Sequence, residues 1–285
     1  MKAKLSKSIE ITNRTIIKEY GGAQVNLVID SNGNKFIEKI QFHNPPKIKV
    51  DFEYGFNILE IFESILKPLE IPHPQIVDSV KNEKSTTIIM EYIDGINCEA
   101  EPKAEYLYLA AEKIGTIYNK SKMNMKRLDK CILEKYTLTK EKVLNQIKVI
   151  GEHFTLPPMD SIIDYICEKY PDPTIFVKHG DLQFKNFIYN GDLHLIDWDN
   201  VHISPFNDVS ALIWHAGEIG ADIDEIKKRY CQFAQISSIN DEDIKLRSII
   251  SIIGEVFTFL IYDCSEWLED SYNELKDKIK SFNKH

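Results

Sequence analysis

Polar residues of the types that phosphoryl transfer uses are clustered in one short stretch of the chain. His179, Asp181 and Asn186 follow the order H-x-D-x-x-x-x-N, and Asp197 comes shortly afterwards in the segment LIDWDN. One carboxylate can take the proton of an attacking hydroxyl, while an amide oxygen and a second carboxylate can hold Mg²⁺, which prefers oxygen ligands. We therefore expect Asp181 to be the catalytic base and Asn186 and Asp197 to be metal ligands. His179 is expected to brace the loop through its ring.

Short apolar segments around these residues predict strands that would hold them on a rigid base. The segments are residues 175–177, 186–189 and 193–196. The last two flank Asn190-Gly191, a strong hairpin signal. Asp197 then follows the last strand, where its carboxylate would leave the sheet beside Asp181. A lone Asp in a loop is more often a turn-former or a helix cap, but the ordered set with its strands favours a catalytic role.

The segments HGDLQFKN and LIDWDN resemble motifs of the aminoglycoside phosphotransferase and choline kinase family, which are protein-kinase-like small-molecule kinases. The resemblance extends more weakly over nearly the whole chain. It implies an α+β, two-lobe fold. Residues 1–94 would form a nucleotide-binding lobe with a small antiparallel sheet, one helix and the hinge. Residues 95–285 would form a larger, mainly helical lobe with the catalytic loop at 177–200 and the substrate pocket.

The same resemblance assigns two further carboxylates. Asp199 would support the metal site or bind a second metal. Asp208 matches a buried aspartate that anchors the catalytic loop from the following helix. The short chain between Asp197 and Asp208 leaves no room for the activation segment of a protein kinase, which favours a small-molecule substrate.

The first part of the chain predicts antiparallel strands at residues 8–12, 23–30 and 35–42, the last two joined by a turn at Asn32-Gly33. Gly21 and Gly22 precede the second strand and fit either a phosphate-binding loop or a simple turn. The resemblance makes Lys39 the lysine that neutralises the nucleotide phosphates, with Lys35 as the lesser candidate.

A helix is predicted from Asp51, as N-cap, to about Leu66, because apolar residues recur there at helical spacing. By resemblance this helix supplies the glutamate that partners Lys39. Glu53 is favoured, and Glu60 and Glu63 remain alternatives.

Residues 75–80 and 86–95 predict two more strands and complete a five-stranded sheet. The segment IIMEYIDG resembles a kinase hinge, in which adenine would bond backbone groups near Glu91 and Ile93. The alternative is a plain edge strand followed by a turn.

The remainder of the chain is predicted to be mainly helical, with apolar faces at residues 104–122, 141–153 and 159–169. The most apolar stretch, residues 249–264, is interrupted by Glu255 and predicts a buried helix, since it is too short to span a bilayer. Acidic and aromatic residues after Asp208 could receive a cationic substrate by ion pairing and cation-π contact. A solvated acidic face with aromatics in the core is the favoured alternative. The residues are Trp214, Glu218, Asp222, Asp224, Glu225, Glu255, Tyr262, Asp263, Glu266, Trp267, Glu269 and Asp270.

Composition narrows the class of protein further. The 285 residues carry a net charge of -9, which disfavours nucleic-acid binding. The five cysteines are widely spaced and the first residues lack an apolar signal sequence, so we expect a cytoplasmic protein. We also expect a monomer or a dimer without a membrane partner. The expected function is an Mg²⁺- and ATP-dependent kinase, with GTP as an alternative donor, that phosphorylates a hydroxyl of a cationic metabolite or antibiotic. The alternative is a non-catalytic kinase-fold protein, such as a spore-coat-like component.

Overall fold

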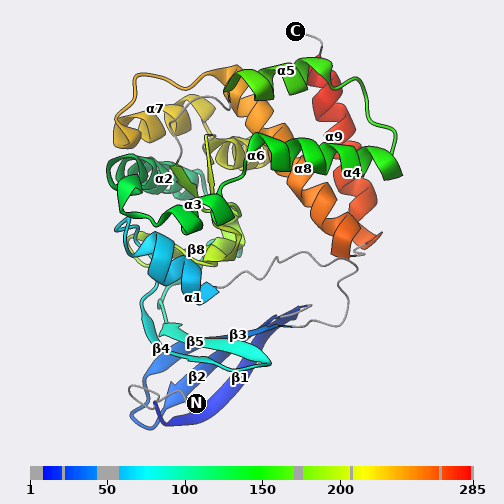
Figure 1. The fold of residues 1–285 in the computed structure, drawn as a ribbon. Helices are drawn as coiled ribbons and strands as arrows, with labels where there is room; N and C mark the ends of the chain where they lie inside the picture. The colour runs from blue at the N-terminus through cyan, green and yellow to red at the C-terminus, as the bar shows by residue number, and fades with distance from the viewer. Residues whose placement is uncertain are drawn as a thin grey trace.

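The computed structural model describes residues 9–20, 23–43, 58–169, 176–205, 208–262 and 265–283. A β-sheet forms one end of the molecule and helices form the other, larger part (Figure 1).

The sheet consists of five antiparallel strands in the order β1-β2-β3-β5-β4. The strands are β1 (Ile11–Tyr20), β2 (Ala23–Asp30), β3 (Lys35–Phe42), β4 (Ile76–Lys81) and β5 (Ser85–Glu91). The turn between β2 and β3 contains Gly33 at φ 84°, a conformation that favours glycine. The predicted hairpin and five-stranded sheet are confirmed, but the strand predicted at residues 8–12 lies instead at Ile11–Tyr20.

The segment between β3 and β4 contains α1 (Ile58–Ile61), which continues as one π-helical stretch, η1 (Phe62–Leu66). Its buried residues are Ile58, Ile61, Phe62, Ile65 and Leu66. The predicted helix is confirmed for these residues, while its expected beginning at Asp51 lies outside the described residues. Figure 1 shows α1 between the sheet and the helices.

The helical part begins with α2 (Ala104–Asn124), η2 (Met125–Arg127), α3 (Lys130–Tyr136), α4 (Lys140–His153) and α5 (Asp160–Lys169). It ends with α6 (Val209–Ile219), α7 (Ile223–Ala234), α8 (Asp241–Tyr262) and α9 (Ser265–Phe282). The helices predicted at 104–122, 141–153 and 159–169 are present. The helix predicted at 249–264 is present over residues 249–262 as part of α8, and its last two residues lie outside the described residues. No helix within the described part of the chain is long and apolar enough to cross a membrane.

Short strands and single helical turns lie between α5 and α6 and carry the candidate site. They are β7 (Phe176–Lys178), η3 (Phe184–Asn186), β8 (Phe187–Tyr189), β9 (Leu193–Leu195), η4 (Trp198–Asn200) and β10 (His202–Ser204). β7 pairs with β10, and β8 pairs with both β9 and β6 (Ile96–Asn97). The predicted hairpin around Asn190-Gly191 is therefore confirmed.

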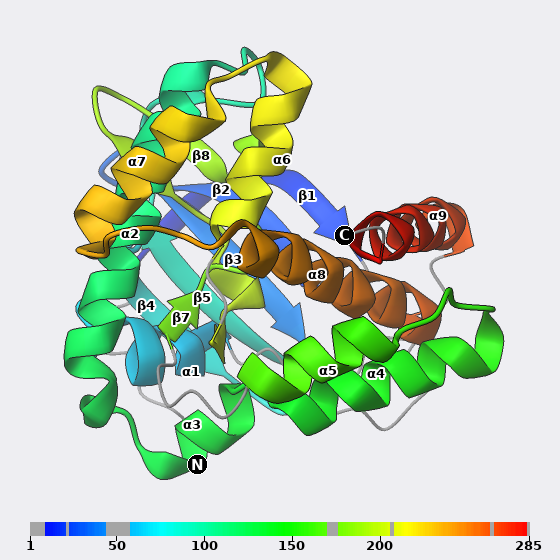
Figure 2. The ribbon, with the colours of Figure 1, turned by 90° about the horizontal axis from the view of Figure 1, so that it is seen from above.

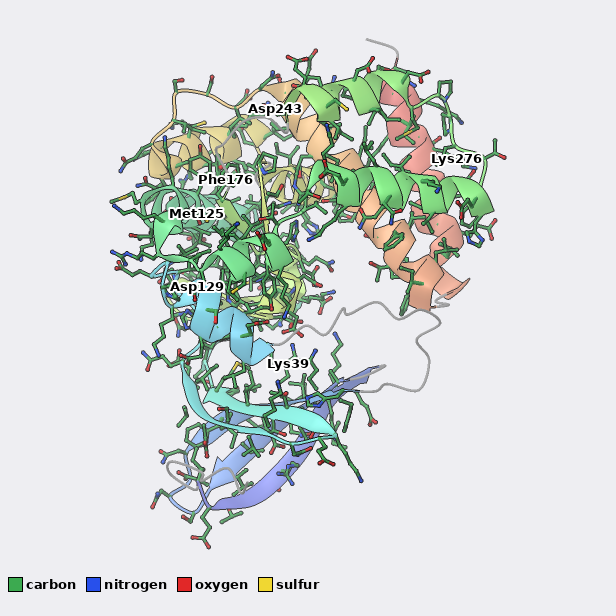
Figure 3. The ribbon with its side chains drawn as sticks, viewed as in Figure 1. Lys39, Met125, Asp129, Phe176, Asp243 and Lys276 are labelled. Atoms are coloured by element: carbon green, nitrogen blue, oxygen red, sulfur yellow. The ribbon has the colours of Figure 1, made fainter. Side chains whose placement is uncertain are left out.

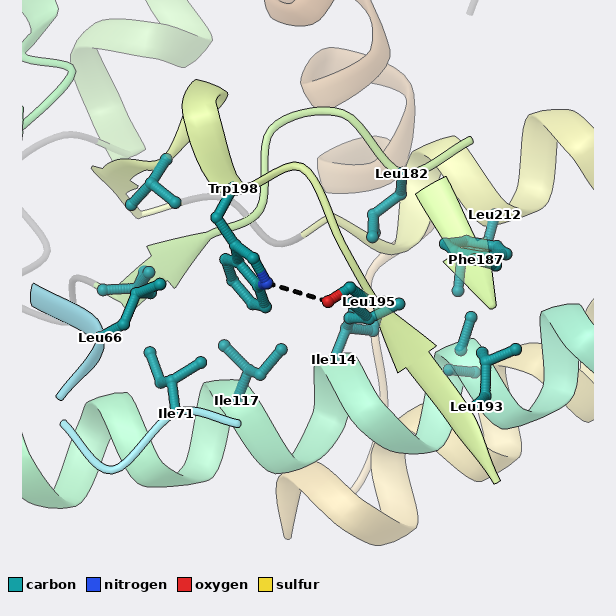
Figure 4. Packing of buried hydrophobic residues seen from close by; sticks show 14 of the residues in the cluster. Leu66, Ile71, Ile114, Ile117, Leu182, Phe187, Leu193, Leu195, Trp198 and Leu212 are labelled. Carbon is teal, nitrogen blue, oxygen red and sulfur yellow. Dashed lines mark hydrogen bonds between the residues drawn. The ribbon is translucent and has the colours of Figure 1, made fainter. Parts of the chain in front are cut away.

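Buried apolar side chains form two separate clusters. The first joins β5, α1, α2, α6 and α7 to the strands around the candidate site. Trp198 lies inside it, 1% exposed, and donates its indole N–H to the carbonyl of Leu195 over 3.0 Å (Figure 4). The second cluster is formed by α4, α5, α8 and α9, which Figure 2 shows to one side of α2, α6 and α7.

Candidate active site

Asp181 and Asn186 lie in the loop that follows β7 and are joined by side-chain hydrogen bonds. The Asn186 amide nitrogen donates to Asp181 Oδ2 over 2.9 Å and to the Asp181 carbonyl over 2.8 Å. The other carboxylate oxygen, Asp181 Oδ1, accepts a 2.6 Å bond from Gln183 Nε2. Because the amide nitrogen of Asn186 faces Asp181, its amide oxygen is left as the atom for a cation.

Two further side chains lie next to Asp181: Gln183, which was not assigned from the sequence as a site residue, and Lys185, for which the sequence left open a contact with the transferring phosphate or a solvated loop lysine. Gln183 holds one carboxylate oxygen directly, and its place two residues after Asp181 was the only signal for it. Lys185 Nζ lies 3.8 Å from Asp181 Oδ2 and is partly exposed. Both side chains are therefore within reach of a group bound at Asp181.

His179 is buried behind this loop and acts on it through both ring nitrogens. Nε2 lies 2.9 Å from the carbonyl oxygen of Ile196 and so carries the proton, while Nδ1 accepts the Asp181 backbone N–H at 3.4 Å. Burial lowers the pKa of His179, which favours this neutral form. The ring also packs on Trp198, with the centroids 4.5 Å apart. The geometry is that of a brace between the loop and the chain after β9.

Asp208 holds the same loop from the beginning of α6. Its Oδ2 accepts backbone N–H bonds from His179 at 2.7 Å and from Gly180 at 3.3 Å. Burial raises the pKa of Asp208, and these N–H groups oppose the increase by stabilising the carboxylate. The structure thus places Asp208 where the resemblance expected the anchoring aspartate.

Gly180 permits a close approach between the two loops of the site. Its φ is +82°, and a Cβ atom there would lie 2.2 Å from the carbonyl oxygen of Asn200. Only glycine combines this conformation with this contact.

Asp197 follows β9 in the left-handed conformation, with φ 62° and ψ 61°. A non-glycine residue there stores about 1–3 kcal/mol of strain, and such strain is common at functional sites. Its carboxylate accepts a 2.6 Å bond from Lys39 Nζ. The conformation therefore aims the Asp197 carboxylate at the sheet.

Lys39 connects the two parts of the molecule. It lies on β3 with 5% of its surface exposed, on the side of the sheet that faces the helices (Figure 3). Its ammonium also pairs with Asp199. Strand alternation explains this direction: Glu38 points to the opposite face, where it binds Arg14 and Asn26.

The two carboxylates around Lys39 have different pKa values. Burial raises the pKa of Asp197, but the charge of Lys39 and its hydrogen bond outweigh burial and lower the net value. Burial dominates at Asp199 and, with repulsion from Asp197, raises its pKa to about 6. Asp199 Oδ1 is buried and has no hydrogen-bond partner among the described residues.

These oxygen atoms suit a hard cation. Within the described ranges, no group of three or more His, Cys, Asp and Glu side chains is placed to hold a metal without other ligands. Asn186, Asp197 and the unpaired oxygen of Asp199 supply an amide oxygen and carboxylates, the donor set that Mg²⁺ accepts when phosphate oxygens complete its shell. The residues present therefore fit a magnesium ion bound together with a phosphate ligand.

The remaining nucleotide-site candidates are placed as follows. Glu91 ends β5 and its backbone N–H donates to Gln75 O at 2.9 Å, and Ile93 follows the strand. Lys35 lies 5.3 Å from the centre of the Tyr92 ring, away from the Lys39 ion pairs. Gly21, Gly22 and Glu53 lie outside the described residues.

The two alternative glutamates on the helix bind cations other than Lys39. Glu60 accepts bonds from Lys135 at 2.5 Å and Tyr136 at 2.7 Å, which tie α1 to α3. Glu63 pairs with Lys67. These contacts give Glu60 and Glu63 structural roles. Glu53 lies outside the described residues, so its pairing with Lys39 stays a prediction.

Three of the acidic residues after Asp208 have structural partners. Asp222 caps α7, Glu225 pairs with Arg229, and the Ser271 hydroxyl donates to Glu255. These contacts favour structural roles for the three acidic residues. Trp214 and Trp267 are 48% and 55% exposed, so these two aromatic side chains do not lie in the core as the alternative expected.

Comparison with solved structures identifies the fold. No family model matches the chain, and no curated protein matches its sequence. A macrolide 2′-phosphotransferase type I superposes with a TM-score of 0.61 at 14% identity, covering 94% of this chain and 92% of its own. An ethanolamine kinase from Plasmodium vivax gives 0.61 at 14% identity, with 95% and 84% covered. A spectinomycin phosphotransferase, solved with ADP and spectinomycin, gives 0.55 at 11% identity, with 97% and 90% covered.

At these identities the likeness shows a common fold. The chain has the protein-kinase-like α+β fold of small-molecule phosphotransferases, as predicted from the sequence.

Proposed function

We propose that this protein is an Mg²⁺- and ATP-dependent kinase that phosphorylates a hydroxyl group of a small molecule. The observation that carries the proposal is the junction of Lys39 on β3 with Asp197 after β9, at 2.6 Å, beside the hydrogen-bonded pair Asp181 and Asn186. The lysine comes from β3, and the amide and the two carboxylates come from the loops after β7 and β9; each is of the type that phosphoryl transfer requires.

In this proposal residues 1–94 bind the nucleotide and residues 95–285 supply the catalytic loop and the acceptor pocket. Lys39 binds the phosphates, and Asn186 and Asp197, with support from Asp199, hold Mg²⁺. Bound Mg²⁺ neutralises charge that develops on the phosphates. The backbone near Glu91 and Ile93 binds the base.

Asp181 orients the acceptor hydroxyl and takes its proton. Gln183 and Asn186 hold one oxygen each of this carboxylate, so its orientation is fixed before the acceptor binds. Both ring nitrogens of His179 are engaged, one with the Ile196 carbonyl and one with the Asp181 backbone N–H, so His179 positions the loop and does not transfer the proton.

The acceptor is a small molecule, because the chain between Asp197 and Asp208 is too short for a protein kinase's activation segment. Proteins of the same fold include phosphotransferases named for macrolides and spectinomycin and a kinase named for ethanolamine. Amino-bearing antibiotics and amino alcohols are therefore the first candidates.

An acceptor screen tests the proposal. Aminoglycosides, macrolides, choline, ethanolamine, amino sugars and nucleosides would each be incubated with the protein and Mg²⁺-ATP, with ADP release measured. A true acceptor gives ADP and a phosphate ester in equal amounts by ³¹P NMR. The Asp181→Asn variant should be slower by about 10²- to 10⁴-fold, which is the usual effect of a positioned base.

The matched control is Asp192→Asn, a change on the β8–β9 turn, where Asp192 pairs with Lys113 at 59% side-chain exposure. Equal rates in Asp181→Asn and the unchanged protein would exclude Asp181 as the base. Absence of ADP release with every acceptor, together with no nucleotide binding, would favour the non-catalytic alternative.

A further inference from the structure

Three buried charged side chains lie between the two apolar clusters. Lys178 ends β7, Asp208 precedes α6, and Arg247 lies in α8, and their exposed fractions are 1%, 8% and 4%. Charged side chains are almost never this deeply buried unless they are paired. α8 contributes apolar residues such as Ile249 and Ile250 to the second cluster, whereas the strands beside the catalytic loop belong to the first.

The two carboxylate oxygens of Asp208 have different partners. Oδ2 accepts the backbone N–H groups of His179 and Gly180 in the catalytic loop. Oδ1 faces the cations: Arg247 Nη2 donates to it at 3.3 Å, and Lys178 Nζ lies 3.2 Å away. Arg247 of α8 therefore holds one oxygen of the Asp208 carboxylate, while the other oxygen holds the backbone of the catalytic loop.

The two cations contribute differently. Arg247 makes a directed hydrogen bond to Asp208. The Lys178 ammonium forms an ion pair but has no hydrogen-bond partner among the described residues. It therefore balances the charge of Asp208 without fixing the orientation of its carboxylate. If Arg247 is replaced by a neutral residue, Lys178 still balances the charge of Asp208. The usual large penalty for leaving a buried carboxylate unpaired is then avoided.

We propose that Arg247 is a positioning residue that connects α8 to the catalytic loop through Asp208. By fixing Asp208, it fixes the backbone of His179 and Gly180 and so the place of Asp181. The first turns of α8 lie against α6, which begins directly after Asp208 (Figure 2). A test of this proposal by kcat rests on the proposed kinase function, whereas a test by hydrogen exchange of the loop amides does not.

The test compares Arg247→Met and Arg247→Lys with Lys245→Met, an exposed cation two residues away on the same helix. Hydrogen exchange of the His179 and Gly180 amides is followed by NMR, with the Ile114 amide in α2 as the internal reference. In Arg247→Met both loop amides should exchange about tenfold faster or more, which corresponds to about 1.4 kcal/mol or more, because a hydrogen bond to a charged group is lost from the network. The Ile114 amide and the Lys245→Met variant should match the unchanged protein.

A second comparison separates the effect of the directed Arg247 hydrogen bond from the effect of positive charge near Asp208. Lys178→Met keeps the Arg247 hydrogen bond, so the two loop amides should stay protected relative to Ile114 even where overall stability falls. Arg247→Lys keeps the charge but not the planar donor, and should show part of the loss. If Arg247→Met does not fold, selective exposure of the two amides in Arg247→Lys supports the proposal, and wild-type protection there overturns it.

Kinetics provide the functional readout once an acceptor is known. Arg247→Met should lower kcat by about 10- to 100-fold, since a misplacement of about 1 Å can cost 10²-fold, and leave KM for ATP nearly unchanged. Unchanged kcat and unchanged loop protection would overturn the proposal, and so would equal acceleration of exchange at every amide. A wild-type protein that phosphorylates nothing would count against the proposed function only, because the exchange comparison still decides the role of Arg247.

Discussion

Replacing Gly180 by alanine tests whether the two loops of the site must touch. An alanine at φ +82° carries a conformational cost of about 1–2 kcal/mol. Its Cβ would also lie 2.2 Å from the carbonyl oxygen of Asn200, so one loop must move, at a further cost of about 1–3 kcal/mol for overpacking. We expect a total loss of about 2–5 kcal/mol in the free energy of unfolding.

The movement should also reach the catalytic groups. Asn200 ends the helical turn that follows Asp197, and Gly180 precedes Asp181. Displacing either loop by about 1 Å should lower kcat by about 10²-fold. The stability would be measured by urea unfolding, and kcat by ADP release with an acceptor from the screen.

Gly33→Ala is the matched control for this experiment. Gly33 has nearly the same backbone angle, φ +84°, but nothing lies within 4 Å of the Cβ position. This variant should lose only the conformational part of the stability, about 1–2 kcal/mol, and keep its kcat. Equal losses of stability and equal rates in Gly180→Ala and Gly33→Ala would refute the contact argument.

Other predictions follow from the groups around Lys39. Lys39→Met should weaken Mg²⁺-ATP binding by about tenfold or more, since hydrogen bonds to charged groups contribute about 1.5–3 kcal/mol. Calorimetry measures this affinity, with Lys35→Met as the control. Equal weakening in both variants would show that Lys39 has no special role. The pKa of Asp199 is raised to about 6. Its proton therefore competes with a metal below that pH, and Mn²⁺ affinity should be about tenfold lower at pH 5 than at pH 7. A dependence that persists unchanged in Asp199→Asn would assign it to another group. Trp198→Phe removes the indole donor from the buried Leu195 carbonyl and should cost about 1–3 kcal/mol in urea unfolding; full wild-type stability would contradict the predicted loss.

Sequence patterns predicted the parts of the fold that have strong local signals. The hairpins at Asn32-Gly33 and Asn190-Gly191 and the amphipathic helix α2 all lie where they were expected. β1 was misplaced because most of it is exposed: with little of the strand buried, its sequence shows no alternation of apolar and polar residues. The π-helical stretch after α1 also has no recognised sequence signal.

The site shows the same division between local and distant information. The order of Asp181, Asn186 and Asp197 pointed to one loop system, but the ion pair between Lys39 and Asp197 joins residues 158 positions apart and depends on the tertiary fold. The sequence also holds a signal for Arg247. It is the single arginine of α8 and is followed by the buried residues Ile249 and Ile250, and an arginine on a buried helix face indicates a buried partner.

Calorimetric titration of ATP into the protein, with Mg²⁺ and then with EDTA, tests the central claim most directly. Asp197→Asn is the variant to compare, because asparagine tolerates the left-handed conformation of this residue but lacks the charge. We predict that the unchanged protein binds ATP at least about tenfold more tightly with Mg²⁺ than with EDTA, which corresponds to about 1.4 kcal/mol or more of binding free energy. In Asp197→Asn this difference between Mg²⁺ and EDTA should disappear. Failure to bind any nucleotide, or the same metal dependence in both proteins, would contradict the assignment of Lys39, Asn186 and Asp197 to a Mg²⁺-nucleotide site.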